Sequence, residues 1–505
     1  MVDRWTKGDR SLFGLRLSLM VVLVVVVIYA EVFYALQVRL YDGLHMTIHD
    51  IQMANQVLFN TLEGRFFENN YANPHVDMWA EGTPHSILEH HLYLILLLIL
   101  PFYYLFPDVY VLFFIQSLAT ACGGLALYLI AKHVSQSDFI SVCLAVSYLL
   151  YPTIQGMTLN RFLYGFHPDI LFPTFLLFAF YFFLKGRMGM TVLFSVMGLL
   201  CAEHLSLTVA MFGLYLAMVG GKSRRPGILI AVGAGLWIVL SVLIIIPHFR
   251  GAPPRYISEL LVSSQTASFE LKPAILLGTL YTKYLFLPLA FTFLLDVPSL
   301  VLALPGMMLS LASRYTGYSP GYDPFSWRMA QLAPFLFLST TLGVCRLHAN
   351  TAPSKRWIPN VPLTYGLAIV VLLGTSSASM LFGPGPWSIS TGEAQYSALN
   401  SAELETLKKL KAMVSPDASF SADPFWGSHF TARRIIHPFP IGWDSDDFVL
   451  VTNKTEPYPR SVKFLDHAQR LRTSGSHRLV LDENGVRLYQ RINTLGLESG
   501  SLLQP

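Results

Sequence analysis

Most hydrophobic positions along the chain are grouped in long blocks. An apolar run of about 20 residues is long enough to cross the roughly 30 Å hydrocarbon core of a bilayer as an α-helix. The first such run covers about residues 17–36. Further runs lie near residues 90–107, 109–131, 138–152, 168–184, 190–219, 227–247, 273–295, 297–313, 329–345 and 362–382. The pattern predicts an all-α polytopic membrane protein with about ten to twelve transmembrane helices.

The basic residues near the first run predict its orientation. Four of them precede it: Arg4, Lys7, Arg10 and Arg16. Positively charged flanks stay in the cytoplasm, so we expect a cytoplasmic N-terminus in the cell membrane. The run is long for a signal peptide, and Glu31 with bulky neighbours makes a poor cleavage site, so it is interpreted as a retained anchor. Three spans between a cytoplasmic N-terminus and Lys132 would place this lysine outside the cytoplasm, which conflicts with the positive-inside rule. The sequence therefore does not settle whether the number of spans before Lys132 is odd or even.

One apolar run differs from the others because polar residues interrupt it. Residues 190–219 are too many for one untilted helix and too few for two full spans. Glu203 and His204 lie near the middle of this run. We therefore expect two short helices that meet at a polar turn.

A charge-balanced tail follows the apolar body. Residues 388–505 contain 13 acidic and 13 basic side chains, out of 31 acidic and 35 basic side chains in the whole chain. The Gly/Pro stretch 383–386 interrupts any helix at this point. We expect a transmembrane domain over residues 1–386, which includes an outer loop 38–89 with amphipathic helices, and a soluble C-terminal α/β domain over residues 387–505.

The tail has the patterns of a small α/β domain. Residues 402–414 place apolar side chains on one stripe, which is typical of an amphipathic helix. Four strand-like runs are predicted, at residues 418–422, 448–452, 478–482 and 486–491. The last two runs are joined through Asn484-Gly485, a pair that tolerates the positive φ angles of a tight hairpin turn.

The amino-acid composition limits the kinds of molecule that this protein can be expected to bind. The chain is 53% hydrophobic and 13% charged, with a net charge of +4, which is typical of a lipid-embedded protein and not of a soluble one. A nucleic-acid-binding protein would need a clustered basic face, so we expect no nucleic-acid partner. The four cysteines lie in or beside apolar runs without a paired spacing, which argues against disulfides and zinc–thiolate sites. The sequence does not predict the oligomeric state.

The outer loop is the richest polar segment of the apolar body. A loop of this length usually has structure of its own or a function. Residues 48–60 mix apolar and polar positions at helical spacing, and Gly64 can end such a helix. Asp50 lies near the start of this amphipathic helix, which we expect on the outer face of the membrane. There it could act as a general base, or it could be a solvated acid favoured by the helix dipole.

Five further ionisable residues open or interrupt apolar runs: His91, His167, Asp169, Glu203 and His204. Ionisable groups at membrane depth are costly and usually face a cavity, a partner or a pathway. Each of the five could be a structural polar group. Because the charge rule assigns all of them to one face, we expect them to meet in one substrate-binding cavity. Imidazoles and carboxylates can also bind a divalent metal, although the spacing matches no known ligand motif.

Arginines at predicted span ends are candidate phosphate ligands, because the planar guanidinium matches phosphate oxygens. Arg161 and Arg255 are the two that we select for a substrate phosphate. Arg250, Arg314 and Arg328 lie in comparable places, where most arginines are ordinary interfacial anchors.

Several motifs together resemble a known family. They are residues 50–66, which begin at Asp50, His91 before a Leu-rich span, Phe166-His167-Pro168, and Glu203. In order and spacing they resemble an uncharacterised family of prokaryotic polytopic membrane proteins that is grouped with the C-type (GT-C) glycosyltransferases. The resemblance implies a GT-C-like fold, an active site at the outer face of the membrane, and a sugar donor carried on polyprenyl phosphate. It gives Asp50 the role of candidate base.

The chain also departs from the pattern of that family. Acids are usual where it has Asn55, His90 and Gly165, and Lys-Glu-Asp is usual where it has residues 202–204. Three functions therefore stay open by fold-level analogy. The first is a glycosyltransferase that uses a lipid-linked sugar donor. The second is a lipid or solute transporter or flippase with Glu203 on its pathway. The third is a catalytically inactive membrane scaffold.

Overall fold

The chain forms two compact units. The computed structural model describes residues 10–71, 84–160, 164–219, 221, 224–254, 271–316, 321–351, 361–389, 397–453 and 462–492. The first unit comprises Met1–Tyr41 and Ile87–Ser397, and we call it the helical unit. The second comprises Asp42–Ser86 and Ala398–Pro505, and we call it the mixed unit because it contains helices and a sheet.

Six helices among the described residues are long and apolar enough to cross a membrane. They are Leu17–Asp42 in α1 (Arg10–Asp42), α5 (Val109–Ser135), Arg224–Arg250, Thr292–Arg314, Trp327–Asn350, and Leu363–Phe382 in α17 (Val361–Phe382). Three of them join several elements: α11 (Arg224–Leu240), η6 (Ser241–Ile245) and α12 (Ile246–Arg250); η9 (Thr292–Ala303) and α15 (Leu304–Thr316); η11 (Trp327–Gln331) and α16 (Ala333–Thr351). The multi-pass membrane class predicted from the apolar runs is thereby supported by the helices themselves.

Other apolar runs form helices that are bent or short. A bend of 45° separates α6 (Asp138–Leu149) from α7 (Pro152–Leu159), and this pair would count as a seventh span. The shorter apolar helices are α4 (Leu96–Leu105), η3 (Pro168–Leu171) with α8 (Phe172–Leu184), α9 (Met188–Leu199), and η4 (Glu203–Leu205) with α10 (Ser206–Val219). The predicted ten to twelve spans therefore include segments whose helices are shorter than a full crossing. The remaining described elements of this unit are η2 (Ile87–Glu89), α14 (Leu271–Tyr281), η7 (Thr282–Phe286) and η8 (Leu287–Leu289).

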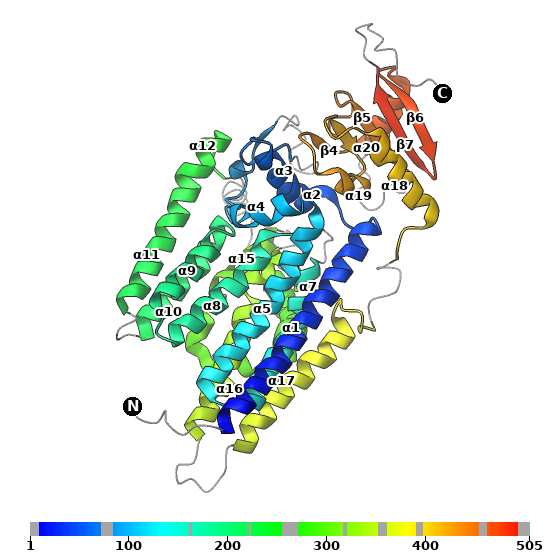
Figure 1. The fold of residues 1–505 in the computed structure, drawn as a ribbon. Coiled ribbons are helices and arrows are strands. Elements are labelled where there is room, and N and C mark those ends of the chain that lie inside the picture. Colours follow the sequence, from blue (N-terminus) through cyan, green and yellow to red (C-terminus); the bar gives the residue numbers. More distant parts are fainter. Residues whose placement is uncertain are drawn as a thin grey trace. The chain divides into compact units, whose positions relative to one another are not determined.

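Small residues let two of these helices approach closely. Figure 1 shows α10 and α11 side by side. A Cβ atom added to Gly213 would lie 2.4 Å from the backbone nitrogen of Ala231, and one added to Gly227 would lie 2.6 Å from that of Ala217. Close backbone packing of this kind replaces the hydrophobic driving force that helices lack inside lipid.

An ion pair between a buried acid and a partly exposed arginine joins three helices elsewhere in the helical unit. The backbone of η9 is kinked at Asp296, which has the non-helical angles φ −133° and ψ 66°. A carboxylate oxygen of Asp296 accepts from the guanidinium of Arg346 on α16. The same guanidinium donates to the hydroxyl of Tyr215 on α10, at 3.1 Å. These three residues form what we call the Asp296–Arg346 pair, which ties a kinked span to its neighbours.

The mixed unit is built on a five-stranded sheet with the order β4-β3-β5-β7-β6. The strands are β3 (Phe420–Ala422), β4 (Ile436–Pro438), β5 (Phe448–Thr452), β6 (His477–Glu483) and β7 (Val486–Arg491). β3 pairs in parallel with β4 and β5, whereas β7 pairs antiparallel with β5 and β6. The predicted hairpin turn is confirmed, because Asn484 and Gly485 have φ angles of 53° and 78°.

Helices from both parts of the chain complete the mixed unit. They are α2 (Ile48–Ile51), η1 (Gln52–Gln56) and α3 (Val57–Leu62) before the membrane spans, and α18 (Ser401–Met413), α19 (Pro424–Gly427), η13 (Ser428–Phe430) and α20 (Val462–Thr473) after them. The short strands β1 (Glu68–Asn69) and β2 (His85–Ser86) pair antiparallel. Helices form at both predicted positions, 48–60 and 402–414, and Gly64 has the left-handed φ of 81° expected after a helix end. Most of residues 48–60 are buried, so this segment is not the helix with one exposed face that the sequence predicts.

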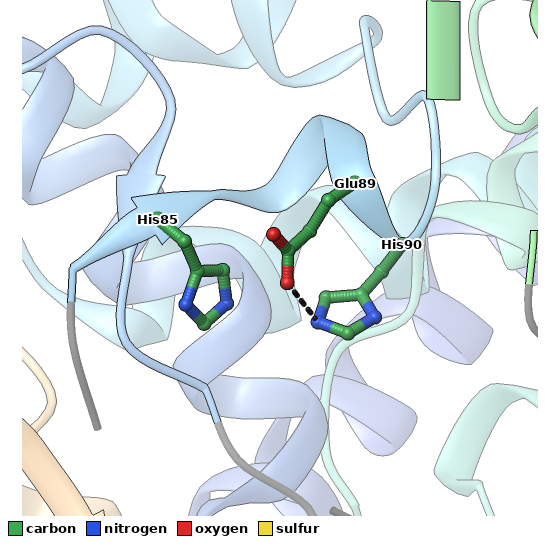
Figure 2. Close-up of side chains that lie close together, drawn as sticks. All are labelled: His85, Glu89 and His90. Atoms are coloured by element: carbon green, nitrogen blue, oxygen red, sulfur yellow. Dashed lines mark ion pairs between the residues drawn. The ribbon is translucent and has the colours of Figure 1, made fainter. Parts of the chain in front are cut away.

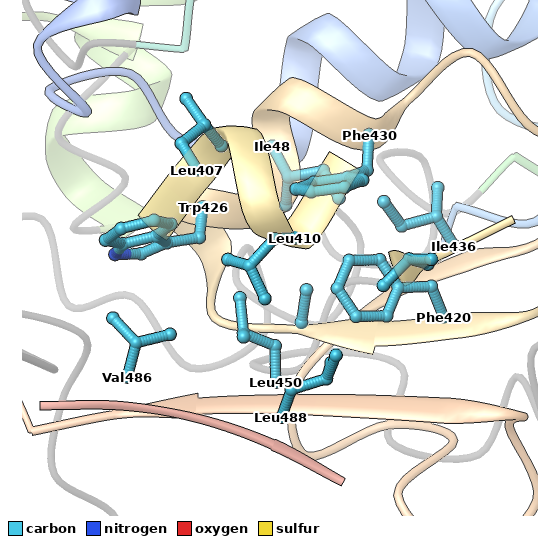
Figure 3. Packing of buried hydrophobic residues seen from close by; sticks show 12 residues of the cluster. Ile48, Leu407, Leu410, Phe420, Trp426, Phe430, Ile436, Leu450, Val486 and Leu488 are labelled. Carbon is cyan, nitrogen blue, oxygen red and sulfur yellow. The ribbon is translucent and has the colours of Figure 1, made fainter. Parts of the chain in front are cut away.

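One hydrophobic core holds the loop and the tail of the mixed unit together. Figure 3 shows Ile48 from the loop among side chains of the tail, including Trp426 and Phe430. Ile48 itself is fully buried. Burial of an aliphatic side chain of this size contributes about 1.5–3 kcal/mol, so the contact stabilises this arrangement of the loop.

Amide side chains extend the same connection to the edge of the sheet. Asn70 accepts from the backbone N–H of Ile436 at 3.1 Å and donates to its carbonyl at 3.0 Å, so it pairs with the edge strand β4 as a neighbouring strand would. Gln56 donates to Asn70 at 2.5 Å, and Gln52 donates to the carbonyl of Ile436 at 2.8 Å. The structure thus groups residues 42–86 with the tail, whereas the sequence analysis places the loop in the transmembrane domain.

Candidate functional site

The break between α9 and η4 positions the first ionisable side chains. α9 ends at Leu199, Ala202 is extended with φ −166° and ψ 155°, and η4 begins at Glu203. The carbonyl of Leu200, which faces this break, accepts from the backbone N–H of Ile95 at 2.7 Å. The prediction of two short helices that meet at a polar turn is confirmed.

Glu203 is fully buried and fixes the segment that contains His91. One carboxylate oxygen lies 2.9 Å from Nδ1 of His91, and the other accepts from the backbone N–H of Leu92 at 3.0 Å. Two segments that are more than a hundred residues apart in the chain are joined here. Because a carboxylate only accepts, this contact places a proton on Nδ1 of His91 when the imidazole is neutral.

Asp169 and His204 form a second contact of the same kind. Asp169 is in the first turn of η3, and only 1% of its surface is exposed. Its Oδ2 atom lies 3.0 Å from Nε2 of His204. His167, immediately before η3, accepts from the backbone N–H of Asp169 at 3.3 Å and so caps this short helix. His167 and Asp169 lie just before α8, and His204 lies just after α9. Because α8 packs on α9, these two chain segments flank one helical hairpin.

Arg328 adds the one positive side chain found at this place among the described residues. Its Nη1 atom lies 3.0 Å from Nε2 of His204 and 3.9 Å from Oδ2 of Asp169. The side chain of Arg328 is 24% exposed, so part of the guanidinium can reach a ligand. We call the six residues His91, His167, Asp169, Glu203, His204 and Arg328 the histidine–carboxylate cluster.

Aromatic rings and an amide hold the imidazoles of the cluster in place. Tyr93 stacks on His91 with ring centres 5.1 Å apart, and Trp327 stacks on His167 at 4.8 Å. The backbone N–H of His167 donates to the side-chain oxygen of Gln116 on α5, at 2.9 Å. Gln116 is itself fully buried in an otherwise apolar helix. These contacts fix the ring planes and reduce the conformational freedom that binding a ligand would otherwise remove.

The structure brings together all five of the ionisable residues predicted to meet. Arg161 and Arg255, the two arginines selected as phosphate ligands, lie outside the described residues. Asp50 belongs to the mixed unit, in the first turn of α2, where it is buried with 9% of its surface exposed. Its role as a base stays a prediction.

His90 does not point to the same partners as its neighbour His91. Its Nε2 atom forms an ion pair with Glu89 at 3.1 Å, as Figure 2 shows. His85, also labelled there, is part of β2 in the mixed unit. Adjacent residues on a turn face different directions, so the separation of His90 from His91 follows from the local backbone geometry.

Sequence reasoning missed several residues of this site. Arg328 was one of five comparable arginines, and nothing in its neighbours separated it from the others. Tyr93 follows His91 at a spacing of two, which gave no signal of stacking. Gln116 did carry a signal, because an amide in the middle of an apolar helix needs a buried partner.

The long apolar helices and the buried cluster between short ones define a multi-pass membrane protein. The chain belongs to the family described as "Predicted membrane protein (DUF2079)", whose sequence profile matches residues 40–488. This match covers most of both units and confirms the membrane class expected from the sequence. A comparison with curated proteins finds no match.

Proposed function

We propose that the chain is a GT-C-like glycosyltransferase of the cell membrane. It transfers a sugar from a polyprenyl-phosphate donor to an acceptor at the extracytoplasmic face, and its N-terminus lies in the cytoplasm. The observation that carries this proposal is the histidine–carboxylate cluster, in which ionisable side chains from distant segments meet in a membrane unit. Ionisable groups at such positions are expensive to bury and usually serve a function.

The cluster suits the phosphate end of a lipid-linked donor. In the transfer, the acceptor oxygen bonds to the anomeric carbon while the bond from that carbon to the phosphate oxygen breaks. Negative charge then develops on the leaving phosphate. Arg328 can donate two parallel hydrogen bonds to phosphate oxygens. Asp169, which contacts His204, keeps this imidazole oriented.

A base must take the proton of the acceptor hydroxyl, and Asp50 is proposed for that role. This assignment rests on the family resemblance and on the position of Asp50 in the first turn of an amphipathic helix. Arg161 and Arg255 remain proposed contacts of the donor phosphate.

A transporter or flippase is the second candidate function. Two breaks in apolar helices carry acids, at Glu203 beside η4 and at Asp296 within η9. Discontinuous helices with ionisable residues at the break are typical of secondary transporters. In such a protein the cluster would bind a headgroup or solute without changing it.

Radiolabelled polyprenyl-phosphate sugars, presented to the full chain in lipid nanodiscs, test the proposal. We expect the wild type to release or transfer sugar, and Asp50→Asn to lower the rate by about 10²-fold or more, the usual cost of losing an acid–base group. Glu203→Gln should also lower the rate, because it removes the charge that orients His91. Asp417→Asn, a matched change at an exposed residue of the mixed unit, should retain the rate. Flux of intact lipid or solute in proteoliposomes without any product would favour the transporter, and inactivity in both assays would contradict both functions.

A further inference from the structure

We propose that His91, Glu203 and His204 form a binding site for a divalent transition-metal ion of the Zn²⁺ type. One ligand atom from each residue can be chosen so that all three lie within 4.8 Å of one another. Oε1 of Glu203 is central, 2.9 Å from Nδ1 of His91 and 3.8 Å from Nδ1 of His204. Both imidazoles thus turn the same nitrogen toward one carboxylate oxygen, and metal binding replaces the Nδ1 proton that His91 donates to Glu203 in the metal-free state.

These separations agree with the size of a tetrahedral site. Zinc binds imidazole nitrogen and carboxylate oxygen at about 2.0–2.2 Å, which puts neighbouring ligand atoms about 3.4 Å apart. The separations of Glu203 Oε1 from Nδ1 of His91 and of His204 lie on either side of this value. Two histidines and one glutamate are also the ligand set of a catalytic zinc site, in which the fourth position is open to water or substrate.

The hydrogen bonding of His204 favours a cation next to its Nδ1 atom. Nε2 of this imidazole lies 3.0 Å from Oδ2 of Asp169 and 3.0 Å from Nη1 of Arg328. In the neutral tautomer that donates Nε2–H to Asp169, Nδ1 has a lone pair. Nδ1 is buried and makes no hydrogen bond within the described part of the chain. The lone pair faces the Glu203 carboxylate at 3.8 Å, an unfavourable contact that a metal ion between the two atoms would make favourable.

Asp169 then has the position of an outer carboxylate that orients a metal-bound histidine. Metal-ligating imidazoles almost always donate their other N–H to a carboxylate or a carbonyl, which fixes the tautomer and raises the basicity of the ligand. The contact between Asp169 and His204 has this geometry, and Asp169 is held in turn by the first turn of η3.

The net charge of the cluster also supports a bound cation. Glu203 and Asp169 are buried carboxylates, whereas Arg328 is the one arginine within ion-pair distance of either among the described residues. With neutral imidazoles the cluster has an excess of one negative charge, and buried charge needs a partner. A divalent cation supplies the missing positive charge. Two nitrogens and one oxygen favour Zn²⁺ and related ions over Mg²⁺ and Ca²⁺, which prefer oxygen ligands.

Metal binding to the purified full chain tests this site without any sugar donor, so its outcome is independent of the proposed function. After removal of metal and of any affinity tag, Zn²⁺ or Co²⁺ is titrated and bound metal is measured by elemental analysis. We expect one equivalent on the wild type. His91→Asn, Glu203→Gln and His204→Asn should each lower the affinity at least 100-fold. Asp169→Asn should keep one equivalent with 10- to 100-fold weaker binding.

His348→Asn is the matched control, because His348 on α16 is outside the histidine–carboxylate cluster and its Nδ1 atom contacts Thr364 at 2.8 Å. This variant should bind metal as the wild type does. The absence of stoichiometric metal on the wild type, or unchanged binding by the His91, Glu203 and His204 variants, would overturn the proposal. If these variants do not fold, the X-ray absorption spectrum of Co²⁺ on the wild type decides. Two imidazole nitrogens support the site, and a shell without imidazole refutes it.

Discussion

Among its described residues, the helical unit buries acids in two places, and the two places differ in how their charge is balanced. In the Asp296–Arg346 pair one carboxylate meets one guanidinium, and Tyr215 completes the contacts of the arginine. In the histidine–carboxylate cluster two buried carboxylates meet three imidazoles and one partly exposed arginine. Both places lie at interruptions of an apolar helix, at Asp296 within η9 and at Glu203 in η4.

The difference separates a structural charge from a candidate site. In the Asp296–Arg346 pair one positive charge balances one negative charge, although Oδ2 of Asp296 is buried without a hydrogen bond to any described residue. The cluster has two carboxylates and one arginine, so with neutral imidazoles it keeps an excess of one negative charge. An acid within a predicted span is therefore weak evidence of function by itself, and an excess of charge around it is the stronger criterion.

The largest expected effect comes from removing one acid at each place. Asp296→Asn removes the charge that balances Arg346, and we expect it to lower the free energy of unfolding by about 1–3 kcal/mol, since Arg346 is partly exposed. Glu203→Gln keeps an acceptor for the N–H of Leu92 and reduces the excess negative charge, so it should cost less stability. Thermal unfolding in detergent, followed by tryptophan fluorescence, measures both.

A double variant sharpens this test. Asp296→Asn combined with Arg346→Gln removes both charges and should recover part of the stability lost by the single change. The comparison fails if Glu203→Gln destabilises the chain as much as Asp296→Asn does, and at the same time leaves sugar release and metal affinity at wild-type values.

A smaller effect is expected when each arginine is replaced by lysine. Arg328→Lys retains the charge but loses the planar fork, so under the proposed function KM for the lipid-linked donor should rise about tenfold, the equivalent of about 1.4 kcal/mol. Arg346→Lys should leave KM unchanged and lower the thermal midpoint, because lysine cannot contact both Asp296 and Tyr215 as the guanidinium does. Steady-state kinetics and thermal unfolding of the two variants separate these outcomes, and equal KM values would contradict the role of Arg328.

Much of the fold follows from local pattern. The interrupted run 190–219 predicted the two helices that meet at Glu203, and the strand pattern of 448–452 coincides with β5. Local pattern did not predict β4, which has only three residues. On the side away from β3, its residue Ile436 is paired with the side chain of Asn70. Local pattern also failed for the loop, since the hydrophobic core that contains both Ile48 and Trp426 joins residues that lie far apart in the sequence.

The candidate site was predictable in its acids and imidazoles but not in its partners. His91, Glu203 and His204 were selected because ionisable groups are rare in apolar runs. The pairing of Asp169 with His204, and the choice of Arg328 among five arginines, depend on how α8 packs on α9 and on where η11 lies. Such contacts between distant helices leave no periodic signal in the sequence.

The smallest expected effect concerns a third group of buried acids, in the mixed unit. Burial raises the pKa of Asp423, which accepts from the N–H groups of Phe425 and Trp426. Burial also raises the pKa of Asp446, although its hydrogen bond to His437 opposes the shift. Because these pKa values are higher in the folded state, their stabilising contribution is fully present below the unfolded pKa near 3.8 and is lost as pH rises through the folded values.

Hydrogen exchange of the amides in β3 and β5, corrected for intrinsic rates, reports the stability of this unit within the full chain. We expect protection to decrease by about 1 kcal/mol or less as pH rises from 4 through the raised pKa values. Asp423→Asn keeps an acceptor for Phe425 and Trp426 but cannot ionise, so it should reduce this pH dependence. The opposite slope would mean that the hydrogen bonds to Asp423 and Asp446 outweigh burial. Both acids would then resemble the balanced Asp296–Arg346 pair more closely than the histidine–carboxylate cluster.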